Sequence, residues 1–133
     1  MIHLQPNTGN QFIYVSPFQA RKFLASFTNY LLIFTNVATE ETFACVMSVA
    51  VDNARYTKAG IGTDGAAPED GEVLITESGL YTYEIYGQNS TTNTDPTDAT
   101  VVGLCEIGPC KVADSAAWTI PSVTIPDNVI YYE

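Results

Sequence analysis

Apolar and polar residues alternate with a period of two along most of this chain, and helical periodicity is scarce. Apolar runs bounded by turn residues predict strands over 10–18, 29–36, 42–53 and 80–87. The run at 29–36 is long and apolar enough for a central strand, and 42–53 is expected to return beside it as a second buried strand. Many short strands with little helix are typical of an antiparallel sandwich or barrel.

Four further ranges complete the expected secondary structure. Residues 55–63 predict a short edge strand, because their basic side chains discourage pairing at a sheet edge. Residues 73–76 and 101–112 predict strands, the second interrupted or bent at the Gly-Pro pair 108–109. Residues 18–27 have the only helix-like spacing, which leaves one or two helical turns and an edge strand both open.

The stretch from Glu77 to Ile85 carries the sharpest fold signal. Gly79 and Tyr81 follow Glu77 at the spacing of a tyrosine corner, in which the tyrosine hydroxyl bonds to backbone a few residues upstream. Strand alternation places Tyr81, Tyr83 and Ile85 on one face, toward a core. This pattern predicts an all-β, immunoglobulin-like antiparallel β-sandwich, with another β-sandwich or a small barrel as the alternative.

The sandwich is expected to span residues 10–112, with extended arms at 1–9 and 113–133. The C-terminal segment alternates apolar side chains, and its prolines at 121 and 126 exclude a helix. It is also too apolar for a free disordered tail. We expect it to contact a neighbouring protein, although a final strand of its own domain stays open. The residues expected to anchor this contact are Trp118, Ile120, Val123, Ile125, Ile130 and Tyr131.

Charge narrows the classes of partner. Fifteen acidic residues against five basic ones give a net charge of −10, which disfavours nucleic-acid binding. The same charge discourages self-association, except where a surface lacks acids. No apolar run approaches the roughly 20 residues that span a bilayer, and no basic region precedes an apolar core at the N-terminus. We therefore expect a soluble protein without membrane contact.

The residues that usually carry chemistry are sparse. An odd count of cysteines, Cys45, Cys105 and Cys110, argues against a disulfide scaffold. The sulfurs of Cys105 and Cys110 would face each other if 106–109 formed a hairpin loop, but separate thiols are the favoured interpretation. His3 is the single histidine, so neither a Ser-His-Asp site nor a paired-ligand zinc site is supported. We expect no enzyme activity, catalytic residue, metal or cofactor.

Four short motifs resemble a family of small proteins encoded among the virion genes of tailed bacteriophages. They are the "FTN" of residues 34–36, the aromatic strand 81–86, the polar loop 90–97 and the "GLCEIG" of 103–108. The resemblance covers roughly residues 29–112 and rests on structural rather than catalytic motifs. It implies a virion structural protein, of the capsid decoration or auxiliary type, and it supplies no site residues.

The function expected on this basis is to stabilise a phage shell through contacts that bridge subunits. The partners would be the major capsid protein or neighbouring copies, so the protein would be oligomeric or lattice-bound in a virion assembled in the host cytoplasm. A tail or head–tail connector component is one alternative. Another is a binding module that recognises a host glycan or protein through the loop 88–100, because loops at one end of such sandwiches are common recognition sites.

Overall fold

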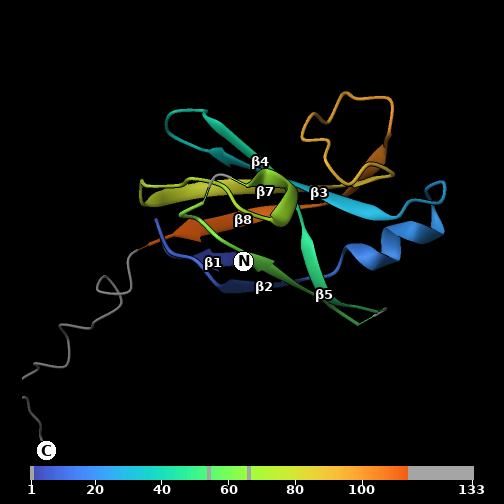
Figure 1. Ribbon diagram of the computed structural model, residues 1–133, viewed down its shortest axis with the longest axis horizontal. Coiled ribbons are helices and arrows are strands. Elements are labelled where there is room, and N and C mark those ends of the chain that lie inside the picture. Colours follow the sequence, from blue (N-terminus) through green and yellow to red (C-terminus); the bar gives the residue numbers. More distant parts are fainter. Residues whose placement is uncertain (1, 54, 66, 114–133) are drawn as a thin grey trace, which may run out of the picture.

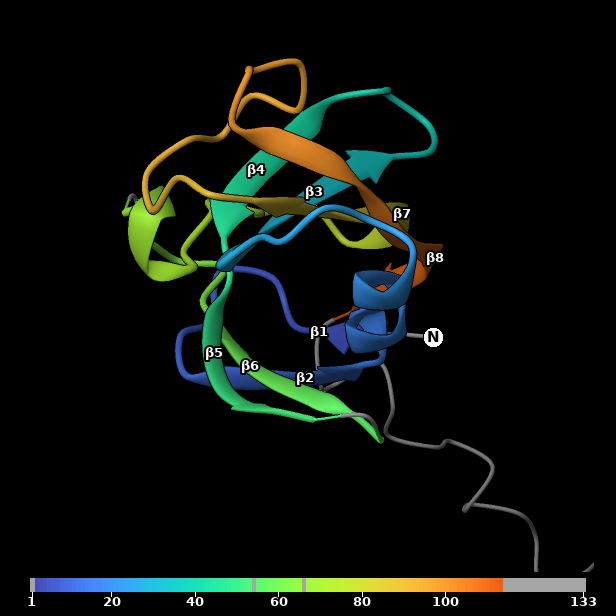
Figure 2. The ribbon, with the colours of Figure 1, turned by 90° about the vertical axis from the view of Figure 1, so that its right-hand side faces the viewer.

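The computed structural model describes residues 2–53, 55–65 and 67–113, and within them eight strands form two sheets packed face to face (Figure 1). The view in Figure 2 separates the two layers, with β3, β4 and β7 above and β2, β5 and β6 below. The expected arms beyond this body differ in outcome: most of 1–9 is described, whereas 114–133 lie outside the described residues.

The larger sheet has five strands in the order β1, β8, β7, β3, β4. Its neighbours are antiparallel except for β1 and β8, which run parallel. The strand bounds are β1 Ile2–Leu4, β8 Val101–Val112, β7 Gly79–Gln88, β3 Asn29–Asn36 and β4 Thr42–Val46.

The smaller sheet has three antiparallel strands in the order β2, β6, β5, with bounds Gln11–Val15, Thr57–Ile61 and Ser48–Asp52. Two short 3₁₀ helices accompany the sheets, η1 at Pro17–Lys22 and η2 at Pro68–Asp70. Neither of these helices, nor any other in the described part of the chain, has the length and apolar character needed to cross a membrane.

The strand order confirms the immunoglobulin-like sandwich. In that fold the third, sixth and seventh strands form one sheet, while the second, fifth and fourth form the other. Here β3, β7 and β8 play the first role, and β2, β6 and β5 the second. The chain changes sheets between β4 and β5, where Met47 alone separates the two strands (Figure 2).

The core lies between the sheets and confirms the predicted facing of β7. Tyr81, Tyr83 and Ile85 of β7 are all buried in it, as strand alternation requires. Opposite them, Ile13 and Ile61 of the smaller sheet close the core from below. The central strand predicted at 29–36 has the bounds that the structure gives β3.

Two strand predictions are wrong in their pairing. Residues 55–63 contain β6, which is the central strand of the smaller sheet rather than an edge, because β5 and β2 flank it on both sides. The basic side chain of this strand, Lys58, points outward and so does not hinder pairing. Residues 42–53 are not one buried strand but β4 and β5, and every residue of β5 is exposed or half-buried.

The expected interruption at residues 108–109 is absent. Strand β8 continues through Pro109, which stands opposite Thr82 in regular register with β7. The irregularities lie earlier, where Cys105 and Val102 are the extra residues of two register shifts. Such bulges bend a strand and increase its twist. In contrast, 73–76 form no strand, although Leu74 makes an isolated bridge.

The N-terminal residues differ from expectation, whereas the cysteines agree with the favoured interpretation of separate thiols. Ile2 and Leu4 belong to the core and β1 pairs with β8, so residues 2–4 are part of the sandwich rather than an arm. Residues 106–109 form no hairpin loop, because Cys105 and Cys110 lie on the same strand. Both thiols are free, as is that of Cys45.

Candidate binding surface

The outer face of the smaller sheet exposes aromatic rings. In β2 the residues alternate, so that Ile13 and Val15 enter the core while Phe12 and Tyr14 point to solvent. Phe12 is 54% exposed and Tyr14 is 62% exposed. The Tyr56 ring, 40% exposed, lies 6.1 Å from that of Tyr14 between ring centroids. We call the surface formed by Phe12, Tyr14, Tyr56 and Lys58 the aromatic face.

Lys58 holds the centre of the aromatic face. Its position on β6 is opposite Tyr14, and its ammonium nitrogen lies 4.4 Å from the Phe12 ring centroid and 5.9 Å from that of Tyr14. Each such cation–π contact at an exposed site contributes about 0.5–1 kcal/mol. The contacts orient the rings without covering them, so the face offers preformed aromatic surface to a partner.

The aromatic face lacks negative charge although the protein is strongly acidic. Strands β2 and β6 contain no acidic residue, and β5 contains only Asp52 at its end. Arg55 precedes Tyr56 in the turn between β5 and β6 and adds a second basic residue at the start of β6. The strands of this face therefore contribute little to the net charge of −10 that opposes association.

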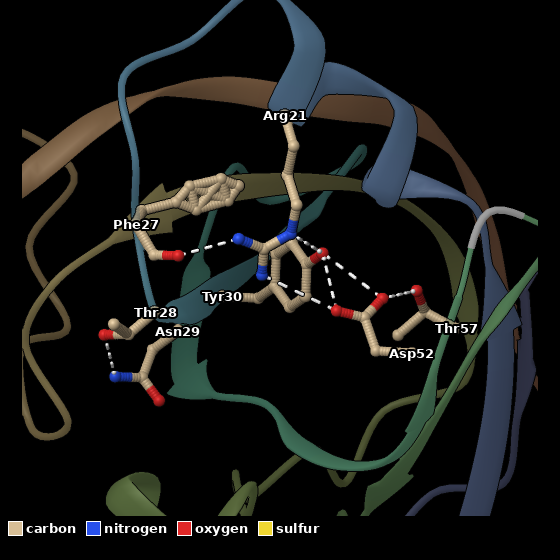
Figure 3. Close-up of polar contacts among 7 residues, drawn as sticks. All are labelled: Arg21, Phe27, Thr28, Asn29, Tyr30, Asp52 and Thr57. Carbon is tan, nitrogen blue, oxygen red and sulfur yellow. Dashed lines mark hydrogen bonds and ion pairs between the residues drawn. The ribbon is translucent and has the colours of Figure 1, made fainter.

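Asp52 belongs to a polar cluster with Arg21, Tyr30 and Thr57 (Figure 3). Its carboxylate accepts hydrogen bonds from the hydroxyls of Thr57 at 2.7 Å and Tyr30 at 3.1 Å. A guanidinium nitrogen of Arg21 lies 3.5 Å from the same carboxylate. Another donates to the backbone carbonyl of Phe27 at 2.7 Å, and the guanidinium stacks 4.1 Å from the Phe27 ring centroid.

This cluster connects the helix η1 to strands of both sheets, because Arg21 lies in η1, Tyr30 in β3 and Asp52 in β5. Burial raises the pKa of Tyr30 from 10.0 to about 12. The hydrogen bond from Arg21 acts in the opposite direction, and the nearby Asp52 charge raises the pKa further. The Tyr30 hydroxyl therefore stays protonated at neutral pH and serves as a structural donor.

An acidic hollow of about 560 Å³ borders the aromatic face at Phe12. Asp64, Asp70 and Glu72 line it, together with several glycines. Within the described ranges, no group of three histidine, cysteine or acidic side chains is arranged to hold a metal ion. The hollow forms an acidic border of the aromatic face.

The three cysteine thiols and the Tyr83 hydroxyl have raised pKa values, so none of them is activated as a nucleophile. Burial raises the pKa of the Cys45 and Cys110 thiols to about 12 and that of Cys105 to about 11. Burial likewise raises the pKa of Tyr83, whose hydroxyl donates to the carboxylate of Glu106. At neutral pH these groups are protonated, and a thiol in that state is a poor nucleophile.

The tyrosine corner predicted at Tyr81 is confirmed. The Tyr81 hydroxyl donates a 2.9 Å hydrogen bond to the backbone carbonyl of Glu77, four residues upstream, and the ring is buried. Gly79 has a φ of +151°, which side-chain-bearing residues rarely adopt. Both residues shape the turn into β7 and lie in the larger sheet, away from the aromatic face.

The loop 88–100 is organised by its own hydrogen bonds. The buried side-chain amide of Gln88 donates to the carbonyls of Ser90 and Asn93 at 3.1 and 3.0 Å. Asp95 and Asp98 each accept hydrogen bonds from a threonine two residues ahead, which lowers the pKa of both carboxyls. These polar groups are thus partly satisfied within the loop, which favours a structural role over recognition.

The sequence interpretation did not single out the aromatic face. The signal was present in "QFIYV" at 11–15, where two aromatic residues alternate with two aliphatic ones. Both sets are apolar, so periodicity alone does not reveal which set faces water. The six C-terminal candidates were Trp118, Ile120, Val123, Ile125, Ile130 and Tyr131, and all lie outside the described residues.

No protein-family model, curated protein or solved structure matches this chain.

Proposed function

We propose that this protein is a structural component of a tailed-phage virion, of the capsid decoration or auxiliary type. It docks through its aromatic face onto the major capsid protein or a neighbouring copy. The observation that carries the docking surface is the exposure of Phe12 and Tyr14 on an acid-free sheet face of a protein with net charge −10. The assignment to a virion rests on the sequence motifs between residues 29 and 112.

Several physical features support a docking role for this surface. Aromatic residues are enriched at the centres of protein interfaces, where full burial of one ring contributes roughly 1.5–3 kcal/mol. Lys58 is already stacked on the rings, and the acidic hollow beside Phe12 suits a basic group at the edge of an interface. On a shell, many weak contacts of this kind add up, because binding of one site raises the local concentration at the next.

Incorporation into particles tests this proposal. The gene would be deleted from a phage that encodes the chain, and the protein supplied from a plasmid. We expect the wild-type protein to appear in purified particles and a Phe12→Ser, Tyr14→Ser variant to be lost from them. The matched control is Ile107→Ser on the larger sheet, because the exposed fraction of Ile107, 61%, is close to the 62% of Tyr14. Absence of the wild-type protein from particles would refute the virion assignment.

The same incorporation experiment tests the predicted role of the C-terminal segment. Truncation after Ala117 removes the apolar residues that the sequence predicts as an arm. We expect the truncated chain to stay folded and to melt close to the wild type, because the described core lies within residues 2–113. We also expect it to be absent from particles. A truncated chain that fails to fold would assign the segment to the core of its own domain.

A further inference from the structure

We propose that the acidic hollow beside Phe12 receives an arginine side chain from an extended segment of the protein that docks on the aromatic face. This inference rests on the docking role proposed above and names the chemistry of the partner. The partner segment carries an arginine, followed by apolar residues at alternate positions. Whether that partner belongs to a virion is a separate question.

Two glycines of the smaller sheet form the floor of the hollow. Strand β6 alternates between core and outer positions, so Lys58, Gly60 and then Gly62 face outward. A Cβ atom at Gly60 would lie 3.8 Å from the Phe12 ring, and one at Gly62 would lie 3.5 Å from the Asp64 carboxylate. The hollow therefore continues the aromatic face along the same strand, where the glycines have no side chains to fill it.

The hollow has three carboxylates that lack partners. Asp64, Asp70 and Glu72 line it, and within the described part of the chain none of these side chains forms a hydrogen bond or an ion pair. The ammonium of Lys58 lies 4.4 Å from the Phe12 ring centroid and does not pair with them. Like charges gathered in one hollow repel each other, so a cation supplied from outside would be stabilised there.

An organic cation suits the hollow better than a metal ion or an anion. The acidic side chains of the described ranges form no group arranged to hold a metal ion. The volume of about 560 Å³ is that of a site for an organic group. The negative charge disfavours the phosphates of nucleic acids and lipids. A basic side chain of another protein is the remaining class of occupant.

Arginine fits these surroundings better than lysine. Its planar guanidinium donates hydrogen bonds to carboxylates in a fixed fork and also stacks on aromatic rings. The molecule already holds one arginine in this way, since the Arg21 guanidinium lies 4.1 Å from the Phe27 ring centroid and 3.5 Å from the Asp52 carboxylate. The exposed ring of Phe12 and the carboxylates of the hollow offer the same two kinds of contact to a partner.

The aromatic rings determine which residues follow the arginine. Gly60 stands opposite Phe12 and Lys58 opposite Tyr14, so the distance along β6 from Gly62 to the level of Tyr14 is about 13 Å. An extended chain advances about 6.6 Å every two residues, so the second and fourth residues after the arginine would meet the two rings. A second copy of this chain is disfavoured, because both copies carry a net charge of −10.

A capped peptide of sequence Arg-Ser-Val-Ser-Val tests the inference on the isolated, intact protein. Its matched control replaces the arginine with citrulline, which has nearly the same shape but no charge. We expect the arginine peptide, at millimolar concentration, to shift the backbone amide signals of Gly60 and Gly62 in heteronuclear NMR spectra. The citrulline peptide should bind at least about tenfold more weakly, because it lacks the charge-assisted hydrogen bonds.

Three variants tie the binding to the hollow. Asp64→Asn, Glu72→Gln removes two charges from it, and Glu40→Gln, Glu41→Gln removes two exposed charges between β3 and β4. Only the first pair should weaken binding of the arginine peptide, by about tenfold. Gly60→Val should also abolish binding, because it places a side chain on the floor at a position with space for its Cβ. The charge variants decide the test if Gly60→Val fails to fold.

Each contrary result overturns the inference. Equal binding of the two peptides, or equal loss in the two charge variants, shows that the hollow does not recognise a cation. Absence of shifts at Gly60 and Gly62 shows that it is not the site. Shifts that depend on protein concentration without peptide, with dimers in the ultracentrifuge, make a second copy the occupant. Absence of the protein from particles would refute the virion assignment alone, and a failed peptide test would leave incorporation into particles unaffected.

Discussion

Both sheets carry apolar side chains on their outer faces. The larger sheet buries some of these side chains, whereas the smaller sheet leaves its aromatic side chains exposed. Leu31 and Ile33 of β3 point away from the core that contains Leu32, and yet both are buried. On the smaller sheet, Phe12 and Tyr14 are more than half exposed. Apolar side chains on the outer face are therefore buried in one sheet and exposed to solvent in the other.

The position of the strand accounts for the difference. Leu31 stands between Tyr86 of β7 and Val46 of β4, so neighbours cover it from both sides. Phe12 and Tyr14 lie on β2, an edge strand with β6 on one side only. Cross-strand neighbours stabilise a sheet through such contacts, and an edge strand has half of them. The outer face of the larger sheet thus contributes to stability, whereas that of the smaller sheet leaves its aromatic rings exposed.

Truncation of Leu31 should give the largest change in stability. Leu31→Ala leaves a cavity at a fully buried position, and we expect it to lower the free energy of unfolding by about 2–5 kcal/mol. The substitution Tyr14→Ala removes the cation–π contact with Lys58 and should lower it by only about 0.5–1 kcal/mol. Urea denaturation followed by circular dichroism measures both. Equal losses would mean that the two faces do not differ as described.

Alkaline pH should lower the stability that the cluster of Arg21, Tyr30 and Asp52 contributes. Because the pKa of Tyr30 is raised from 10.0 to about 12, the folded state binds the phenolic proton more tightly than the unfolded state. The associated stability is complete below pH 10 and is lost as the pH rises toward 12. It amounts to about 2–3 kcal/mol. Denaturation across this range should show a shallower decline for Tyr30→Phe, and an unchanged slope would contradict the assignment.

Loss of the Arg21 side-chain charge should have a moderate effect. Arg21→Met removes the ion pair with Asp52, the hydrogen bond to the Phe27 carbonyl and the stacking on its ring. We expect a destabilisation of about 1–3 kcal/mol. Lys22→Met in the same helix is the control, because Lys22 is exposed. If the control is equally destabilising, the helix η1 rather than the cluster is responsible.

Removal of the tyrosine-corner hydroxyl should have the smallest effect. Tyr81→Phe deletes one hydrogen bond to the Glu77 carbonyl and should destabilise by about 0.5–1.5 kcal/mol. Tyr86→Phe is the comparison on the half-buried outer face, where the hydroxyl donates to Glu84 at 3.0 Å. We expect it to cost less than Tyr81→Phe in the same denaturation experiment. The reverse order would show that the corner does not contribute as expected.

The parts of the fold that depend on local sequence were predictable. The run at 29–36 has five consecutive apolar residues at 30–34, as suits a strand buried on both faces, and the corner at Gly79 and Tyr81 depends on spacing alone. The central place of β6 was not predictable, because its partner β5 was hidden inside the run 42–53. The aromatic face was missed for a related reason. Only packing against Ile61 and its neighbours decides that Ile13 and not Phe12 is buried.

A photo-cross-linking amino acid at position 14, in protein assembled into purified particles, tests the central claim most directly. The account predicts a cross-link from position 14 to another virion protein, identified by mass spectrometry, and none from the same amino acid at position 107. Cross-links to a virion protein from position 107 and none from position 14 would contradict the account.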